Sequence, residues 1–154
     1  MRRLVCLGGV ATLLAILAPA LWAEDPVPND QLAAKLVGTW KLVSFKADGV
    51  ESDLPKRLTV LKHITPTHMT WIRIQPDTGE VVTMAGGTWK IEGDKFSDTP
   101  SYASGDAGKI VKGGTHTFTC KIVGNRWYHN GALATGLKLE EVWELVEREP
   151  AEKN

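Results

Sequence analysis

The sequence has few cysteines and no excess of charge of either sign. Its 154 residues include only two cysteines, and 18 basic residues balance 18 acidic ones. A chain so close to neutrality offers no electrostatic reason to bind nucleic acid or an anionic membrane surface. We therefore expect neither nucleic acid nor a charged membrane as a partner.

Catalytic sequence motifs are also missing. The chain has no Gly-x-Ser-x-Gly elbow, no phosphate-binding loop and no dinucleotide fingerprint. The pairs Gly86-Gly87 and Gly113-Gly114 are not phosphate loops, because neither is followed by a helical pattern. Gly86-Gly87 lies within a strand pattern, where it predicts a bulge or a bend. The sequence thus carries no recognisable enzyme signature and predicts no cofactor.

Only one long apolar run occurs, over residues 4–18. Arg2 and Arg3 precede it, and the segment after it ends in the small residue Ala23, as in a secretory signal peptide. The run is short for a membrane span. We expect residues 1–23 to be a signal peptide cleaved after Ala23, and the mature protein to be secreted or periplasmic with no integral membrane anchor.

Cleavage would remove two arginines and Cys6. The mature chain would then carry 16 basic and 18 acidic residues, a net charge of −2, and Cys120 as its one cysteine. Because no intramolecular disulfide could form, an exported domain of this kind must be held together by its core. Five tryptophans are suited to that role: Trp40, Trp71, Trp89, Trp127 and Trp143.

Alternating apolar and polar residues predict an all-β domain. Turn residues such as Asp48-Gly49 and Gly124-Asn125 separate most of the segments, and sequential hairpins at this spacing favour an up-and-down antiparallel barrel of about eight strands. The predicted strands are 39–47, 57–64, 67–75, 80–91, 94–103, 114–123, 125–132 and 137–147. The predicted organisation is a tether and short N-terminal helix over 24–37, a barrel over 38–147 with a flexible connection at 103–114, and a charged tail over 148–154.

Gly38 and Trp40 lie at the start of the first predicted strand. This Gly-x-Trp opening resembles that of lipocalins and their calycin relatives, small closed β-barrels that carry apolar ligands. Lys41-Leu42-Val43-Ser44 follows Trp40 where the haem-binding calycins similar to nitrobindin have a glycine run, so haem is not expected. Trp40 is expected to plug the barrel end beside the N-terminal helix.

Further segments are similar to an uncharacterised lipocalin-like family of secreted bacterial proteins. The resemblance covers most of residues 36–147. It implies a calycin-type barrel and carries over no activity. The segments that carry it are 62–71, 85–89, 121–133 and 139–144.

Period-two alternation over residues 116–122 places the even-numbered side chains on an apolar face. Cys120 belongs to that face. We therefore expect its thiol to be a small buried hydrophobe rather than a reactive group.

Glu141 lies in an otherwise apolar row that includes Leu139 and Trp143. A buried carboxylate needs a partner or a raised pKa. One interpretation is therefore an interior Glu141 paired with an arginine or histidine from another strand, among them Arg73, His116 and His129. The alternatives are a salt bridge at the barrel rim, or a local bulge that turns the side chain outward.

Four histidines could in principle converge inside a barrel and hold a metal ion. Their spacing does not require this, since no His-x-His or Glu-x-x-His pair occurs. We predict no metal site and expect structural or pocket-lining histidines. They are His63, His68, His116 and His129.

The leading hypothesis is an exported lipocalin-like protein that binds a small, mainly apolar or amphipathic molecule inside its barrel. Trp71 and Trp143 would supply apolar walls, while polar side chains would orient one end of the ligand. The candidate ligand-binding residues are Trp71, Arg73, Tyr102, His116, Tyr128, His129, Glu141 and Trp143.

Three alternatives stay open. The aromatic side chains could fill the barrel and leave no space for a ligand. The protein could be a pocket enzyme, an isomerase or hydrolase, that uses Glu141 with His116 or His129. It could also be a non-catalytic interaction protein of the cell envelope, forming a homodimer through a strand edge.

Overall fold

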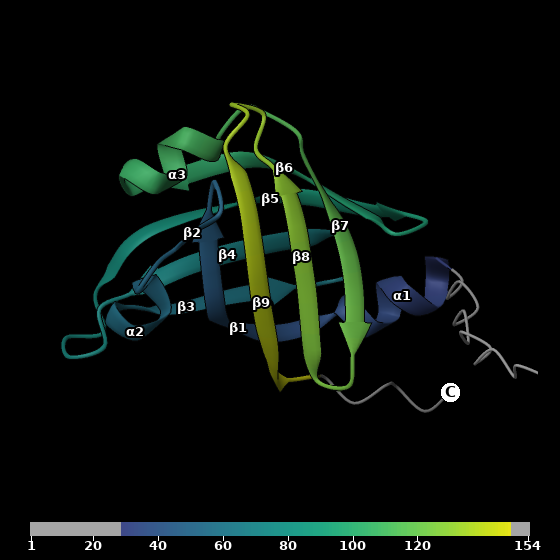
Figure 1. Ribbon diagram of the computed structural model, residues 1–154, viewed down its shortest axis with the longest axis horizontal. Helices are drawn as coiled ribbons and strands as arrows, with labels where there is room; N and C mark the ends of the chain where they lie inside the picture. The colour runs from purple at the N-terminus through teal and green to yellow at the C-terminus, as the bar shows by residue number, and fades with distance from the viewer. Residues whose placement is uncertain (1–28, 149–154) are drawn as a thin grey trace, which may run out of the picture.

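The computed structural model describes residues 29–148, which fold into nine strands and three helices around one barrel (Figure 1). The predicted signal peptide, the tether over 24–28 and residues 149–154 of the tail lie outside the described residues. Among residues 29–148, no helix has the length and apolar character needed to cross a membrane. The elements are α1 (Asn29–Leu36), β1 (Gly38–Ala47), β2 (Val50–Glu51), α2 (Leu54–Arg57), β3 (Thr59–Ile64), β4 (His68–Ile74), β5 (Val81–Glu92), β6 (Lys95–Ser104), α3 (Gly105–Val111), β7 (His116–Val123), β8 (Arg126–Ala132) and β9 (Lys138–Glu147).

The strands pair in chain order. From β3 to β9 each strand pairs antiparallel with the next, and β1 pairs with both β3 and β9. The β1–β9 pairing closes β1 and β3–β9 into a barrel of eight strands, while the two-residue β2 pairs with the end of β1. The predicted up-and-down barrel is confirmed. The sequence did not predict β2 or the one-turn helix α2.

Helices α1 and α3 lie at opposite ends of the barrel (Figure 1). This follows from the chain path, because α1 leads into the start of β1 whereas α3 joins the end of β6 to the start of β7. At the α1 end, Trp40 is fully buried and its Nε1 donates a hydrogen bond to the Leu36 carbonyl oxygen at 2.7 Å. The expected plug beside the N-terminal helix is confirmed.

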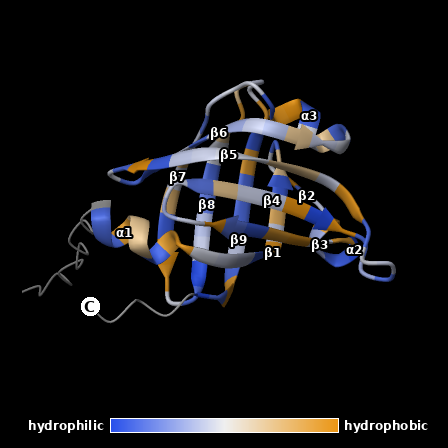
Figure 2. Ribbon diagram, turned by 180° about the vertical axis from the view of Figure 1, so that it is seen from behind, coloured by the Kyte–Doolittle hydropathy of each residue, from blue (hydrophilic) through white to orange (hydrophobic). Residues whose placement is uncertain are grey.

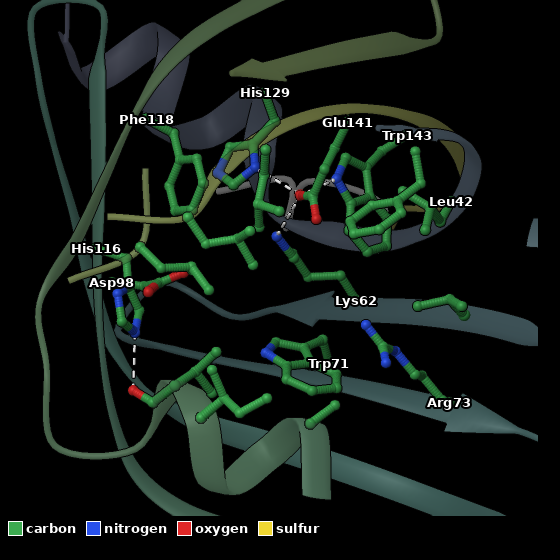
Figure 3. A pocket seen from close by; sticks show the side chains of 18 residues that line it. Leu42, Lys62, Trp71, Arg73, Asp98, His116, Phe118, His129, Glu141 and Trp143 are labelled. Carbon is green, nitrogen blue, oxygen red and sulfur yellow. Dashed lines mark hydrogen bonds and ion pairs between the residues drawn. The ribbon is translucent and has the colours of Figure 1, made fainter. Parts of the chain in front are cut away.

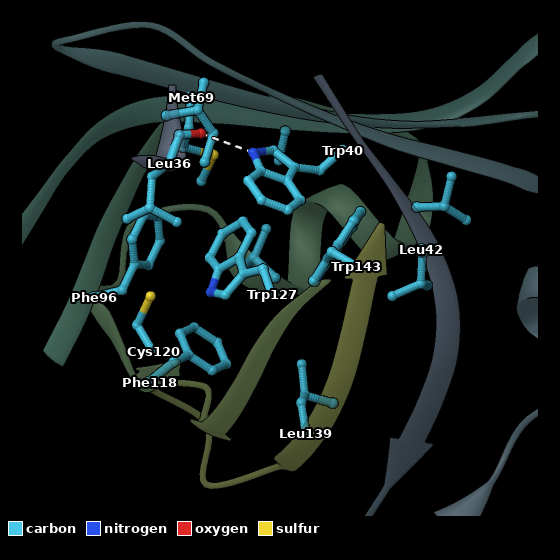
Figure 4. Close-up of a cluster of buried hydrophobic side chains, with 14 of the residues drawn as sticks. Leu36, Trp40, Leu42, Met69, Phe96, Phe118, Cys120, Trp127, Leu139 and Trp143 are labelled. Carbon is cyan, nitrogen blue, oxygen red and sulfur yellow. Dashed lines mark hydrogen bonds between the residues drawn. The ribbon is translucent and has the colours of Figure 1, made fainter. Parts of the chain in front are cut away.

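Apolar side chains fill the interior next to α1, where Leu36, Trp40 and Met69 are buried together, and the cluster continues into the walls of the other half (Figure 4). Trp127 is the centre of this cluster: its ring lies 5.6 Å from Trp40, 5.3 Å from Phe96 and 6.2 Å from Trp143, measured between ring centroids. The contacts of Trp127 with Trp40 and Phe96 are edge-to-face, and contacts of this kind add to the stabilisation that comes from the buried area alone. An interior filled by aromatics, one of the open alternatives, therefore describes one half of the barrel.

The ribbon of Figure 2 carries both hydrophilic and hydrophobic colours along its strands, and buried and exposed residues alternate along much of β7 and β9. The predicted inward row of 116–122 is correct, and Cys120 is only 4 % exposed. Burial raises the pKa of its thiol to about 12, so the thiol is a poor nucleophile. The predicted irregularity at Gly86-Gly87 is also confirmed, as a shift in the β5–β6 register.

The predicted flexible connection at 103–114 is wrong, because residues 105–111 form α3. Its glycines allow close packing rather than flexibility. Gly108 donates its backbone N–H to Thr83 Oγ1 at 3.0 Å, and a Cβ at Gly108 would lie 2.4 Å from the Met84 carbonyl oxygen. Only glycine lets the helix backbone approach β5 this closely.

Candidate functional site

The half of the barrel next to α3 is hollow (Figure 3). Its cavity has a volume of about 190 Å³. An engineered protein cavity of about 150 Å³ accepts benzene, so this one suits a molecule of one or two small rings. The apolar part of the lining is Leu42, Phe45, Val60, Trp71, Ala107, Ile110, Val111, Phe118, Leu133, Leu137, Leu139 and Trp143.

Glu141 lies in the wall of this cavity and is only 8 % exposed. Its Oε2 accepts hydrogen bonds from His129 Nδ1 at 2.8 Å and from Trp143 Nε1 at 3.0 Å, and it lies 3.7 Å from Lys62 Nζ. The inward assignment of the row containing Glu141 is therefore correct, and of the three expected partners His129 is the one that it contacts. The alternatives of a rim salt bridge or an outward bulge are wrong.

Lys62 is the partner that the sequence analysis missed. Its side chain is buried, and Nζ lies 4.4 Å from the ring centroid of Trp143 and 4.9 Å from that of Trp127. Aromatic faces and a carboxylate together compensate a buried ammonium group. The available signal was the alternation Val60, Lys62, Ile64, which places the lysine on the inward face of β3.

The surroundings fix the protonation of the His129–Glu141 pair. Burial lowers the pKa of His129 to about 4, and the charge of Lys62 acts in the same direction. Burial alone would raise the pKa of Glu141, but Lys62 and the donors His129 and Trp143 outweigh it and lower that pKa to about 2. At neutral pH the pair is thus a carboxylate and a neutral imidazole whose Nδ1 carries the proton.

His116 joins two segments at the edge of the cavity. Its Nε2 lies 2.8 Å from the Val111 carbonyl oxygen at the end of α3, and its Nδ1 accepts the backbone N–H of Ala134 at 2.9 Å. One ring nitrogen must donate and the other must accept, so His116 is neutral with its proton on Nε2. Both nitrogens are occupied, and His116 holds α3 against the β8–β9 connection.

Asp98 also lines the cavity, and the sequence analysis did not single it out. It is 5 % exposed, and its Oδ1 has no hydrogen-bond partner among residues 29–148. Burial raises the pKa of Asp98 to about 6, against the opposing charge of Lys62. The alternation Phe96, Asp98, Pro100 was the available signal, since all three side chains are buried.

Arg73 and Trp71 form a polar and aromatic wall on β4. The guanidinium carbon of Arg73 lies 5.3 Å from the Trp71 ring centroid, a cation–π contact. Burial lowers the pKa of Arg73, while Glu141 opposes that shift. Arg73 Nε has no hydrogen-bond partner among the described residues.

The structure brings six of the eight candidate ligand-binding residues to the cavity. Two are placed elsewhere. Tyr128 lies between the inward-facing Trp127 and His129, and adjacent strand residues point to opposite faces, so Tyr128 faces away from the interior. The six that line the cavity are Trp71, Arg73, His116, His129, Glu141 and Trp143.

Tyr102 faces outward because of a bulge. The β5–β6 register jumps from the Gly86–Tyr102 pair to the Gly87–Pro100 pair, which leaves Ser101 as an extra residue. The extra residue reverses the alternation that buries Pro100. Tyr102 consequently lies over Gly86 on the outside, and its hydroxyl contacts Thr70 Oγ1.

The two remaining histidines lie away from the cavity. His63 Nδ1 is 3.1 Å from Thr39 Oγ1, and His68 Nδ1 is 2.8 Å from Thr67 Oγ1. Across residues 29–148, no group of three or more histidine, cysteine or acidic side chains is placed to hold a metal ion.

No model of a known protein family matches the sequence, and no curated protein does. Among solved structures, a redesigned β-barrel is 13% identical over 75% of this chain and 96% of its own, with a TM-score of 0.50. A lipocalin-like protein from Bacteroides uniformis is 15% identical over 73% of this chain and 99% of its own, with a TM-score of 0.47. Fatty-acid-binding protein 1 from Echinococcus granulosus is 10% identical over 73% of this chain and 98% of its own, with a TM-score of 0.41. The barrel fold that the sequence resemblance implied is confirmed by the structure itself, in which β1 and β3–β9 close into an antiparallel barrel.

Proposed function

We propose that this protein is an exported binding protein that encloses a small, mainly apolar molecule in the cavity next to α3. The observation that carries the proposal is the division of the barrel interior. The α1 half is packed with aromatic side chains, whereas the α3 half retains a cavity lined by apolar walls and a few buried polar groups. That combination is typical of small-molecule sites.

The polar groups of the cavity restrict how a ligand is oriented. Glu141 and His116 already have protein partners, so they shape the wall rather than bind the ligand directly. Asp98 Oδ1 and Arg73 Nε have none among the described residues. A ligand would therefore place its polar atoms toward Asp98 or Arg73 and its apolar body against Trp71, Phe118 and Trp143.

Blocking the cavity tests the proposal. Benzofuran is a suitable probe, since its two fused rings match the volume, and calorimetry measures its binding to the mature protein. We expect binding to the unmodified protein and at least a tenfold loss in Ala107→Trp, which places an indole in the cavity. Lys109→Trp is the matched control, because Lys109 lies on the same helix with an exposed side chain. Absence of binding to the unmodified protein, or equal binding by both variants, would refute the proposal.

The His129–Glu141 pair supports a second candidate function, a pocket hydrolase or isomerase. A carboxylate that fixes the tautomer of a histidine is an arrangement used by general bases. Here, however, His129 Nε2 is buried and has no partner among the described residues, so a substrate would need to displace a wall residue to reach it. Hydrolysis of p-nitrophenyl acetate that is lost in His129→Gln but kept in His68→Gln would favour the enzyme. Equal rates for both variants would exclude His129 as the base.

A further inference from the structure

Asp98 lies in the barrel wall at the end of the pairing between β6 and β7. The β6–β7 ladder begins at the Lys95–Thr119 pair and ends at the Asp98–His116 pair, whereas β6 itself continues along β5 to Ser104 before α3 begins. Beyond this pair β6 has no partner in β7, and α3 packs against β5 and β6 there. The carboxylate of Asp98 therefore lies at the point where the β6–β7 pairing ends next to α3, and it lines the cavity there.

The protein leaves this carboxylate with unused hydrogen-bonding capacity. Buried polar atoms are nearly always paired, and an unpaired buried acceptor costs free energy. Asp98 is 95 % covered, yet its Oδ1 has no donor among residues 29–148. Its ladder neighbour His116 has both ring nitrogens engaged with Val111 and Ala134, so it cannot supply the missing bond.

The charged groups of the cavity lining decide what kind of hydrogen-bond donor fits beside Asp98. Among the groups that line the cavity, Lys62 and Arg73 are cationic, Glu141 is anionic, and His116 is neutral because its two ring nitrogens donate one hydrogen bond and accept another. With Asp98 ionised, the two cations and two anions of the lining balance, so an additional cation would meet two like charges in a confined space. A neutral N–H or O–H group completes the hydrogen bonding without disturbing this balance.

We infer that Asp98 is a ligand-binding residue, and that the ligand is a neutral one- or two-ring molecule that donates an N–H or O–H hydrogen bond to the carboxylate of Asp98 where it lines the cavity. The inference rests on the proposed binding function and narrows it to a ligand class. In Figure 3, Asp98 lies beside His116 and Arg73 lies on the far side of Trp71. The donor would thus be at the Asp98 end of the cavity, with the rings beside Trp71.

Indole and benzofuran test the inference because they share size and shape, and only indole carries an N–H donor. Calorimetry on the mature protein should give a dissociation constant for indole at least tenfold below that for benzofuran, as expected for a hydrogen bond to a charged acceptor. Equal affinities would overturn the role of Asp98 while leaving the binding function intact. If neither compound binds, the proposed function fails, and this inference fails with it.

Substitutions assign the preference to Asp98. Asp98→Leu should bind benzofuran and should lose the preference for indole, whereas Asp106→Leu, at a fully exposed position on α3, should keep it. If Asp98→Leu does not fold, Asp98→Asn serves instead: its neutral acceptor should reduce the preference at least threefold, because charge-assisted bonds are stronger. A preference that is unchanged in the folded Asp98 variant would overturn the inference. So would a protonated amine of similar size, such as 2-aminoindane, that binds more tightly than indole.

Discussion

His129 and Glu141 face each other directly across the β8–β9 ladder, with Nδ1 and Oε2 2.8 Å apart. The strand register therefore enforces the bond, and Trp143, two residues along β9, donates to the same oxygen. Lys62 approaches this oxygen from β3. A buried charge is thus fixed in the cavity wall by three separate partners.

Removal of the Glu141 charge should destabilise the fold. In Glu141→Gln the buried Lys62 loses its counter-charge, and breaking one side of a buried pair costs about 3–5 kcal/mol. Urea denaturation at pH 7 measures the loss. The double variant Lys62→Met/Glu141→Gln removes both charges, and should recover at least half of the lost stability. A double variant less stable than Glu141→Gln would show that the two charges do not compensate each other.

Asp98 should make the fold less stable as pH rises. Its pKa in the folded protein is about 6, above the ordinary value of 3.8, so the folded state holds this proton more tightly than the unfolded state does. The tighter binding of this proton adds to the free energy of unfolding below pH 3.8, and that contribution is lost as pH rises through 6. Asp98→Asn removes this penalty and should be about 1–3 kcal/mol more stable than the unmodified protein at pH 7.

The difference in free energy of unfolding between Asp98→Asn and the unmodified protein should shrink toward zero near pH 3.5. At that pH the carboxyl group of Asp98 is protonated in both the folded and the unfolded state. Urea denaturation at the two pH values checks this. A less stable Asp98→Asn at pH 7 would mean that Asp98 has a favourable ionic partner after all.

Trp40 should contribute strongly to stability. It is fully buried at the α1 end, and truncation of a buried tryptophan costs about 3–5 kcal/mol. Trp40→Ala is the test variant. Trp40→Phe, which keeps a ring but loses the bond to the Leu36 carbonyl, should cost less. A decrease in the free energy of unfolding of less than about 1 kcal/mol for Trp40→Ala, measured by chemical denaturation, would contradict the role of Trp40 as a buried plug of the barrel end.

Export is tested at the N-terminus. The sequence predicts cleavage after Ala23, so N-terminal sequencing of the protein recovered outside the cytoplasm should begin at Glu24. Replacing Ala23 with arginine should block processing, because signal peptidase requires a small residue there. Recovery of the full-length chain from membranes in the unmodified case would contradict the prediction.

The barrel was predictable because its signals are local. Turn pairs such as Asp48-Gly49 and period-two alternation over residues 116–122 locate strands and faces without any knowledge of the partners. The same alternation predicted that Glu141 points inward. It should also have excluded Tyr128, since Tyr128 and its neighbour His129 cannot both face the interior.

The rest of the site depends on relationships that a single strand does not reveal. Lys62 meets Glu141 only because β1 lies between β3 and β9 in the closed barrel. Tyr102 turns outward because one extra residue, Ser101, reverses the alternation of β6. Glycines that read as a flexible connection are instead required where α3 packs on Met84. Strand pairing, bulges and close backbone contacts depend on how distant segments meet in the folded chain, so they cannot be read from the residues of one segment.

Native mass spectrometry of the mature protein, purified under gentle conditions from the organism that makes it, tests the central claim most directly. We predict that the unmodified protein retains a small molecule as a discrete added mass, and that Ala107→Trp, with its cavity filled, appears as the bare polypeptide. The Lys109→Trp control should retain the same added mass as the unmodified protein. Bare polypeptide masses for all three proteins, or the same added mass on all three, would contradict a ligand-binding cavity next to α3.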